Sequence, residues 1–311
     1  MINTTEMSSF PITVHQYPFS ARPDRPHAAF EYLPLSGSAD PQNALIFIPG
    51  LGDLPFDVPY IRTIASKLAS SSFSIFEINL NSSGSAFGHG SISQDVRDIC
   101  DLFKYLKGIG RNKVVLMGHS TGCQDCLGYA AAVAEGRVEG VEGYVLQGPV
   151  SDREAIGLSA GRVEGGVEVV RQALRVAEGM VKEGRGGEVM KAEVLPGEWR
   201  GSPVTAYRWA SLAGVGGDDD YFSSDLDDED LKEIWGRVHS PVLMLPSGAD
   251  EFVPESVDAL GMVERWKGFC RPSVVSELSG LIPGANHRVD DATAKEWLAD
   301  RVAQFLGELR E

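Results

Sequence analysis

Two hydrophobic patterns alternate along the first half of the chain. Continuous apolar runs, which are typical of strands buried on both faces of a sheet, occur at 44–48, 73–80, 114–117 and 141–147. Between these runs, apolar residues recur at helical spacing, as they do from Ile61 to Leu68 and from Val96 to Leu106. This alternation predicts an α/β fold with a mostly parallel central sheet flanked by helices on both faces.

The pattern is different at the start of the chain and again after residue 150. Residues 12–17 and 28–35 are short β-type runs on either side of a Pro-rich turn, which predicts an antiparallel hairpin at the edge of the sheet. Residues 151–239 contain an amphipathic helix around 167–181 and no convincing strand. Strand character returns at 241–245 and 273–278, and a closing helix carries Leu298, Val302 and Phe305 on one face. We therefore predict a core formed by 1–150 and 240–311, with a mainly helical cap inserted at 151–239.

Charge and composition narrow the class of function. The chain has 311 residues and a net charge of −16, from 28 basic and 44 acidic residues. This balance argues against nucleic acid or an anionic membrane surface as a partner, because both are bound through Lys and Arg. It is compatible with a cationic ligand, or with solubility alone.

Neither a secretory signal nor a membrane span is evident in the sequence. Met1–Phe10 has no basic region followed by an apolar one, so we expect no secretory signal. No apolar stretch approaches the roughly 18 residues of a membrane span, and four Cys do not make a disulfide scaffold. We expect a cytoplasmic protein.

The strongest chemical motif is Gly118-His119-Ser120-Thr121-Gly122, which lies between an apolar run and a helix-compatible stretch. Strand, G-x-S-x-G turn and helix in that order form the nucleophile elbow of α/β-hydrolases. The turn is so tight that both flanking positions require Gly, and its strained Ser is lifted clear of the backbone. The motif predicts Ser120 as a nucleophile, although a tight turn without function would give the same pattern.

A serine nucleophile needs a base and an acid that holds the base, and in this fold they follow it in the order acid, then His. Asp250 comes directly after the strand at 241–245, and His287 lies in a loop before the last helix. We predict a Ser120, Asp250 and His287 triad. Asp250 could instead cap a helix, in which case Glu251 would be the substitute acid.

Backbone amides should stabilise the oxyanion in such a site. We predict the Thr121 amide as one donor and the Leu51 amide, in the loop after the strand at 44–48, as the other. The Gly50-Leu51-Gly52 stretch also resembles a dinucleotide loop, but Pro55 replaces the third Gly of that motif. Cys123 and Cys126 form a C-x-x-C, for which a buried structural role is favoured over redox or zinc chemistry.

An acidic run covers residues 218–230, with eight carboxylates in thirteen residues. The simplest interpretation is a solvated loop and the charged start of a helix. Calcium binding is an alternative, but the Gly of an EF-hand loop is missing. A third alternative is a patch that faces substrate. The candidate substrate contacts are Asp53, His89, Asp220, Tyr221 and Phe222.

The motifs that distinguish this chain within the superfamily are 118–125, Pro203-Val204-Thr205-Ala206-Tyr207-Arg208 and Asp219–Asp225. Together they resemble a fungal and plant family of small cytosolic hydrolases long left without assigned function, whose characterised fungal member is the siderophore esterase SidJ. The resemblance covers nearly the whole chain. One departure is Pro49, which stands where a His often precedes the oxyanion glycine. The resemblance implies hydrolysis of ester bonds in fusarinine-type hydroxamate siderophores, with iron release inside the cell.

The sequence thus predicts a serine esterase of the α/β-hydrolase superfamily that needs no metal or cofactor. Its predicted partner is a small ester, and the resemblance implies a cationic hydroxamate siderophore with or without Fe(III). A general carboxylesterase or thioesterase, and a binding protein without turnover, are the alternatives.

Overall fold

A seven-stranded sheet organises the computed structural model, which describes residues 10–33 and 41–309. The strand order is β1-β2-β4-β3-β5-β6-β7. The strands are β1 (Ile12–Tyr17), β2 (His27–Tyr32), β3 (Asn43–Ile48), β4 (Phe73–Ile78), β5 (Val114–His119), β6 (Gly143–Gln147) and β7 (Val242–Leu245). The β1–β2 and β2–β4 pairs are antiparallel and the others are parallel. The edge hairpin and the parallel core are confirmed; Pro34 and Leu35, the end of the predicted strand 28–35, lie outside the described residues.

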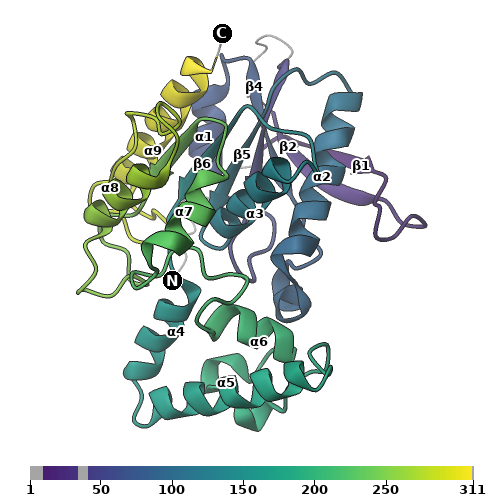
Figure 1. The fold of residues 1–311 in the computed structure, drawn as a ribbon. Coiled ribbons are helices and arrows are strands. Elements are labelled where there is room, and N and C mark those ends of the chain that lie inside the picture. Colours follow the sequence, from purple (N-terminus) through teal and green to yellow (C-terminus); the bar gives the residue numbers. More distant parts are fainter. Residues whose placement is uncertain (1–9, 34–40, 310–311) are drawn as a thin grey trace.

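Helices cover both faces of the sheet (Figure 1), as the α/β-hydrolase fold predicted from the sequence requires. On one face, side chains of α1 (Ile61–Leu68) and α9 (Ala292–Glu308) join the core. On the other, the core includes α2 (Ile92–Gly108), α3 (Gly122–Ala134), α7 (Asp228–Gly236) and α8 (Ala259–Phe269). Each of β3, β4, β5, β6 and β7 is buried at every position, which explains their continuous apolar runs.

The strand predicted at 273–278 does not form. Only one parallel bridge, between Val242 and Val275, lies there in the described part of the chain. Ser273 has a φ of 64°, which breaks the extended conformation at the start of the segment. Further along, the Ser279 hydroxyl accepts a hydrogen bond from the Met244 amide at 3.1 Å, in place of a backbone carbonyl.

A second layer of helices lies beyond one end of the sheet (Figure 1). It contains α4 (Asp152–Gly161), α5 (Gly166–Lys182) and α6 (Ala206–Ala213), with the short turns η3 (Ala192–Val194) and η4 (Gly197–Trp199). These elements share their own apolar cluster, whereas Trp235 of α7 belongs to the core under the sheet. We propose that the cap is formed by α4 to α6, inserted after β6. The described helices include none that is both long and apolar enough to cross a membrane.

Candidate active site

Ser120 occupies a strained turn between β5 and α3. Its φ is 55°, a left-handed conformation that residues other than glycine rarely adopt. A Cβ on Gly118 would lie 2.2 Å from the carbonyl oxygen of Gly122, and one on Gly122 would lie 2.3 Å from that of Ile48. Neither position therefore has room for a side chain. At Gly118 the space is taken by the backbone of the turn itself, and at Gly122 by the backbone at the end of β3.

His287 and Asp250 are joined by a hydrogen bond of 2.7 Å between Nδ1 and a carboxylate oxygen. Both side chains are shielded from solvent, at 5% and 2% exposed. The Glu251 carboxylate accepts a hydrogen bond from the backbone amide of His287 at 2.8 Å, so it contacts the loop rather than the ring. Asp250 thus faces the imidazole, and Glu251, the substitute acid considered from the sequence, holds its backbone.

Ser120 and His287 line the same cavity, whose volume is about 490 Å³. The core contributes Gly50, Leu51, Asp53, His119, Val150, Glu251, Phe252 and Arg288 to this cavity, and the cap contributes Asp152, Ala155, Ile156, Ser159, Glu198 and Trp199. The Phe252 ring packs edge-on against His287 with centroids 4.8 Å apart. Ser120 and His287 therefore open on one space that is large enough for a small-molecule ligand and that has both apolar and acidic side chains on the cap side.

The two amides predicted to bind an oxyanion lie beside Ser120. Leu51 lines the cavity, and Thr121 is the residue before the first turn of α3. Among the described residues, neither the Leu51 nor the Thr121 amide donates to an acceptor of the chain. A helix N-terminus with a free amide favours negative charge.

His119, which precedes the nucleophile, is almost fully buried beside His287, with ring centroids 5.0 Å apart. Burial, and next the charge of His287, lower the pKa of His119 to about 4. His119 is therefore neutral at physiological pH. Its Nδ1 lies 2.5 Å from Oε1 of Gln147, a buried residue at the end of β6. No motif in the sequence singles out Gln147, because its contacts come from segments far apart in the chain.

Two predicted substrate contacts near the oxyanion loop have different surroundings. Asp53 lines the cavity, but its carboxylate accepts from the Gly50 amide at 3.2 Å and pairs with Arg288 at 3.0 Å. His89 is exposed at the end of the turn η2 (Gly84–His89) and is not among the residues of the described chain that line the cavity.

The other three candidates lie elsewhere. Asp220 and Tyr221 line a separate cavity of about 380 Å³ between α2, α3 and α7. Phe222 packs on Trp266 with ring centroids 5.4 Å apart. In the part of the chain that the structure describes, none of the three lines the cavity that contains Ser120.

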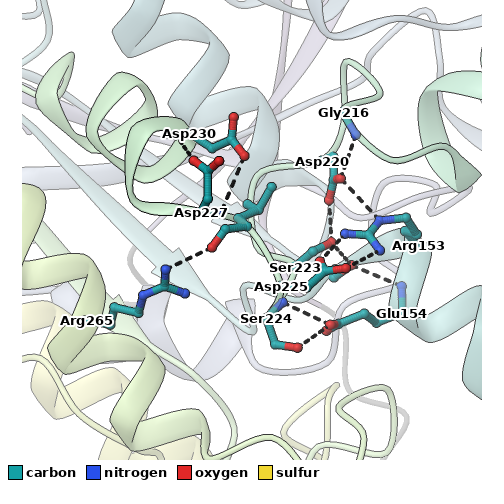
Figure 2. Close-up of polar contacts among 12 residues, drawn as sticks. Arg153, Glu154, Gly216, Asp220, Ser223, Ser224, Asp225, Asp227, Asp230 and Arg265 are labelled. Atoms are coloured by element: carbon teal, nitrogen blue, oxygen red, sulfur yellow. Dashed lines mark hydrogen bonds and ion pairs between the residues drawn. The ribbon is translucent and has the colours of Figure 1, made fainter.

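Asp220 is a structural residue of the acidic run (Figure 2). Its side chain is 1% exposed and accepts from Arg153 at 3.2 Å and from the Gly216 amide at 3.0 Å. Arg153 also binds Asp225, so one guanidinium holds two carboxylates of the run.

Other carboxylates of the acidic run also form structural contacts. Asp227 caps α7 by accepting from the Glu229 and Asp230 amides, and Asp228 pairs with Arg265 at 2.8 Å. Asp219 is buried against Arg208 at 2.7 Å. Within residues 10–33 and 41–309, no three His, Cys, Asp or Glu side chains are grouped to hold a metal ion.

Asp152 is a carboxylate of the cavity that the sequence did not single out. It lies at the start of α4 and accepts a hydrogen bond of 2.7 Å from Gln124. Burial, and next the charge of Asp219, raise the pKa of Asp152 to about 8. Cys123 and Cys126 are buried behind the elbow, and burial raises the pKa of both thiols well above the ordinary value. Such thiols are poor nucleophiles.

Sequence comparison identifies relatives over most of the chain. Residues 5–307 match the family described as "Protein of unknown function (DUF1749)". A UPF0613 protein of Schizosaccharomyces pombe is 34% identical over 285 residues, covering 86% of this chain and 88% of the relative. The fusarinine C esterase sidJ of Aspergillus fumigatus is 30% identical over 319 residues, covering 86% and 89%.

Structure comparison agrees with this. The siderophore hydrolase EstB from Aspergillus fumigatus superimposes with a TM-score of 0.80 and 27% sequence identity, covering 98% of this chain and 99% of that one. The fold is therefore shared over nearly the whole length of the two chains.

Proposed function

The chain belongs to the DUF1749 family, and from that premise and the geometry of the Ser120 cavity we propose that it is a serine esterase. The observation that carries the proposal is the 2.7 Å bond between Asp250 and His287, on the wall of the cavity that Ser120 also lines. A carboxylate on Nδ1 fixes the tautomer that leaves Nε2 free to accept a proton. The names of the relatives sidJ and EstB, an esterase and a hydrolase, support the same reaction class.

In the proposed reaction, Nε2 of His287 takes the hydroxyl proton of Ser120 while Oγ attacks the ester carbonyl carbon. The negative charge on the carbonyl oxygen is stabilised by the amides of Leu51 and Thr121. The protonated His287, paired with Asp250, then gives its proton to the departing alcohol. A water molecule, deprotonated by His287, then attacks the acyl carbon; the bond to Oγ of Ser120 breaks, Oγ takes the proton back from His287, and the acid is released. No step requires a metal or cofactor.

We propose a fusarinine-type hydroxamate siderophore as substrate, so that hydrolysis in the cytoplasm would release Fe(III). The names of the two Aspergillus relatives support this substrate class. Fusarinine C keeps free amines and is cationic when they are protonated, which suits a chain of net charge −16. The Glu198 side chain at the cavity, which has no basic partner among the described residues, adds to that attraction.

Two experiments test the proposal at separate levels. A fluorophosphonate probe should form an adduct on Ser120, and Ser120→Ala should lower kcat by about 10⁴-fold or more. An absent adduct would favour a binding protein. Mass spectrometry of products from iron-loaded and iron-free fusarinine C, compared with short-chain esters and thioesters, tests the substrate. If kcat/KM is no higher for the siderophore, a general carboxylesterase or thioesterase is the better description.

A further inference from the structure

The Gln147 side chain uses its full capacity for hydrogen bonds in a fully buried position. Its Oε1 lies 2.7 Å from the Tyr60 hydroxyl and 2.5 Å from Nδ1 of His119. Its Nε2 donates to the Ser247 hydroxyl at 3.2 Å and to the backbone carbonyl of His287 at 3.3 Å. A carboxamide has two acceptor and two donor positions, so each of them has a partner.

The orientation of this amide is fixed by the His287 carbonyl, which can only accept. A flipped amide would place Oε1 against that carbonyl oxygen and leave two acceptors in contact. With Oε1 toward His119, Nδ1 of His119 must carry the proton. The neutral His119 ring beside His287 is thus held in a single tautomer.

Gln147 also contacts the elbow through its backbone. Its carbonyl oxygen accepts from the Ser120 amide at 3.0 Å and from the Cys123 thiol at 3.3 Å. Gln147 therefore contacts the backbone of Ser120, the side chain of His119 and the loop that carries His287.

We propose that Gln147 is a positioning residue for ester hydrolysis, whose side-chain amide couples the nucleophile elbow to the His287 loop. The inference rests on the proposed serine esterase function. Ser120 and His287 lie on separate segments, β5 to α3 and the loop before α9, and the Asp250 contact holds only the His287 ring. Gln147 adds a tie between the two segments. A displacement of about 1 Å between reacting groups can lower the rate by about 10²-fold.

Gln147→Glu tests the bond to the His287 carbonyl most directly. It keeps the shape and the acceptor toward Tyr60 and His119, but an ionised carboxylate cannot donate to the His287 carbonyl. Gln147→Met removes every polar contact at similar volume. Tyr60→Phe and Ser247→Ala are matched controls, because each deletes one partner of Gln147 and leaves the bond to His287. We expect both Gln147 variants to lower kcat by about 10- to 100-fold with KM within about twofold. The controls should stay within about threefold in kcat.

The inference is overturned if folded Gln147→Glu and Gln147→Met have the kcat of wild type. It is also overturned if their kcat falls no further than that of Tyr60→Phe and Ser247→Ala when the four variants have equal melting temperatures. A measurement on the wild-type protein does not depend on variants that fold. In a ¹H–¹⁵N spectrum, the Gln147 side-chain protons should be protected from exchange and should shift when the probe labels Ser120. Unprotected protons that do not shift would also overturn it.

Failure of the underlying function gives a different result. If wild type neither hydrolyses esters nor reacts with the fluorophosphonate, the esterase proposal fails. If wild type does both and Gln147→Glu matches it, only the positioning role of Gln147 fails.

Discussion

Gly50 and Ser120 approach each other so closely that a Cβ on Gly50 would lie 2.9 Å from the Cβ of Ser120. The same atom would lie 3.1 Å from the Asp53 carboxylate and 3.3 Å from the His119 ring. The loop after β3 can therefore approach Ser120 this closely only because residue 50 has no side chain. This contact connects the carboxyl ends of β3 and β5.

Gly50→Ala should separate the Leu51 amide from the Ser120 hydroxyl. Loss of one oxyanion donor costs about 10²- to 10³-fold in kcat, so we expect a fall in kcat of that order and a smaller change in KM. Steady-state kinetics on a short-chain ester measures both. Gly157→Ala is the control, since nothing lies within 4 Å of its new Cβ in α4. Wild-type kcat in Gly50→Ala would contradict the oxyanion role of this loop.

Asp250→Asn and Glu251→Gln distinguish the two neighbouring acids. Asn at 250 would favour the wrong tautomer of His287 and could not stabilise its protonated form, so kcat should fall by about 10⁴-fold. Glu251 contacts the His287 backbone amide at 2.8 Å and not the ring. Glu251→Gln should therefore retain most of kcat. Equal losses in the two variants, measured at the same pH, would contradict the assignment of Asp250.

The features that the sequence predicts most directly depend on local spacing. The elbow is fixed by glycines two residues on either side of Ser120, and Asp250 and His287 follow from their positions after strand-like segments. The contacts of the acidic run, in contrast, do not follow from local spacing. Asp220 is bound by Arg153, 67 residues away, and no pattern in the sequence connects the two.

Gln147, the positioning residue proposed above, illustrates the same limit. Its side chain joins Tyr60, His119, Ser247 and His287, and the last two are 100 and 140 residues away. In the sequence it is only the last residue of an apolar strand. The strand predicted at 273–278 is a case in which a local pattern misleads. The composition of this segment favours a strand, but the positive φ of Ser273 interrupts the extended backbone.

Asp220→Asn tests whether the acidic run is structural. The substitution weakens a buried contact with Arg153, so we expect unfolding free energy to fall by about 1–3 kcal/mol. The KM for an ester should not change, because Asp220 lies outside the Ser120 cavity. Urea denaturation and steady-state kinetics provide the two readouts, with the exposed Glu229→Gln as a control for charge. A raised KM at unchanged stability would restore the substrate role.

Asp95→Asn should stabilise the protein at alkaline pH. Burial, and next the charge of Asp98, raise the pKa of Asp95 from 3.8 to about 7. Between these values the folded protein binds a proton that the unfolded chain has lost, so stability falls as pH rises across this window. Asn does not titrate and can still accept from Ser82, which lies 2.7 Å from Asp95.

Melting temperatures from pH 5 to pH 8 measure the effect of Asp95→Asn. The difference between variant and wild type should grow in favour of the variant as pH rises. The control is again Glu229→Gln, which removes one negative charge from the surface. A constant difference across the range, or one matched by Glu229→Gln, would show that Asp95 does not carry a buried charge at pH 8.

The contact between Gly88 and the cap gives the last prediction. A Cβ on Gly88 would lie 2.0 Å from the carbonyl oxygen of Pro203, and the Gly88 carbonyl accepts from the Thr205 amide at 2.9 Å. Gly88→Ala must therefore push the segment before α6 away from η2. Because the cap supplies Trp199 and Ile156 to the cavity, we expect a lower melting temperature together with a raised KM for esters. Gly201→Ala, where nothing lies within 4 Å of the new Cβ, should leave both unchanged. If Gly88→Ala keeps the melting temperature and KM of wild type, the Pro203–Arg208 segment does not anchor the cap.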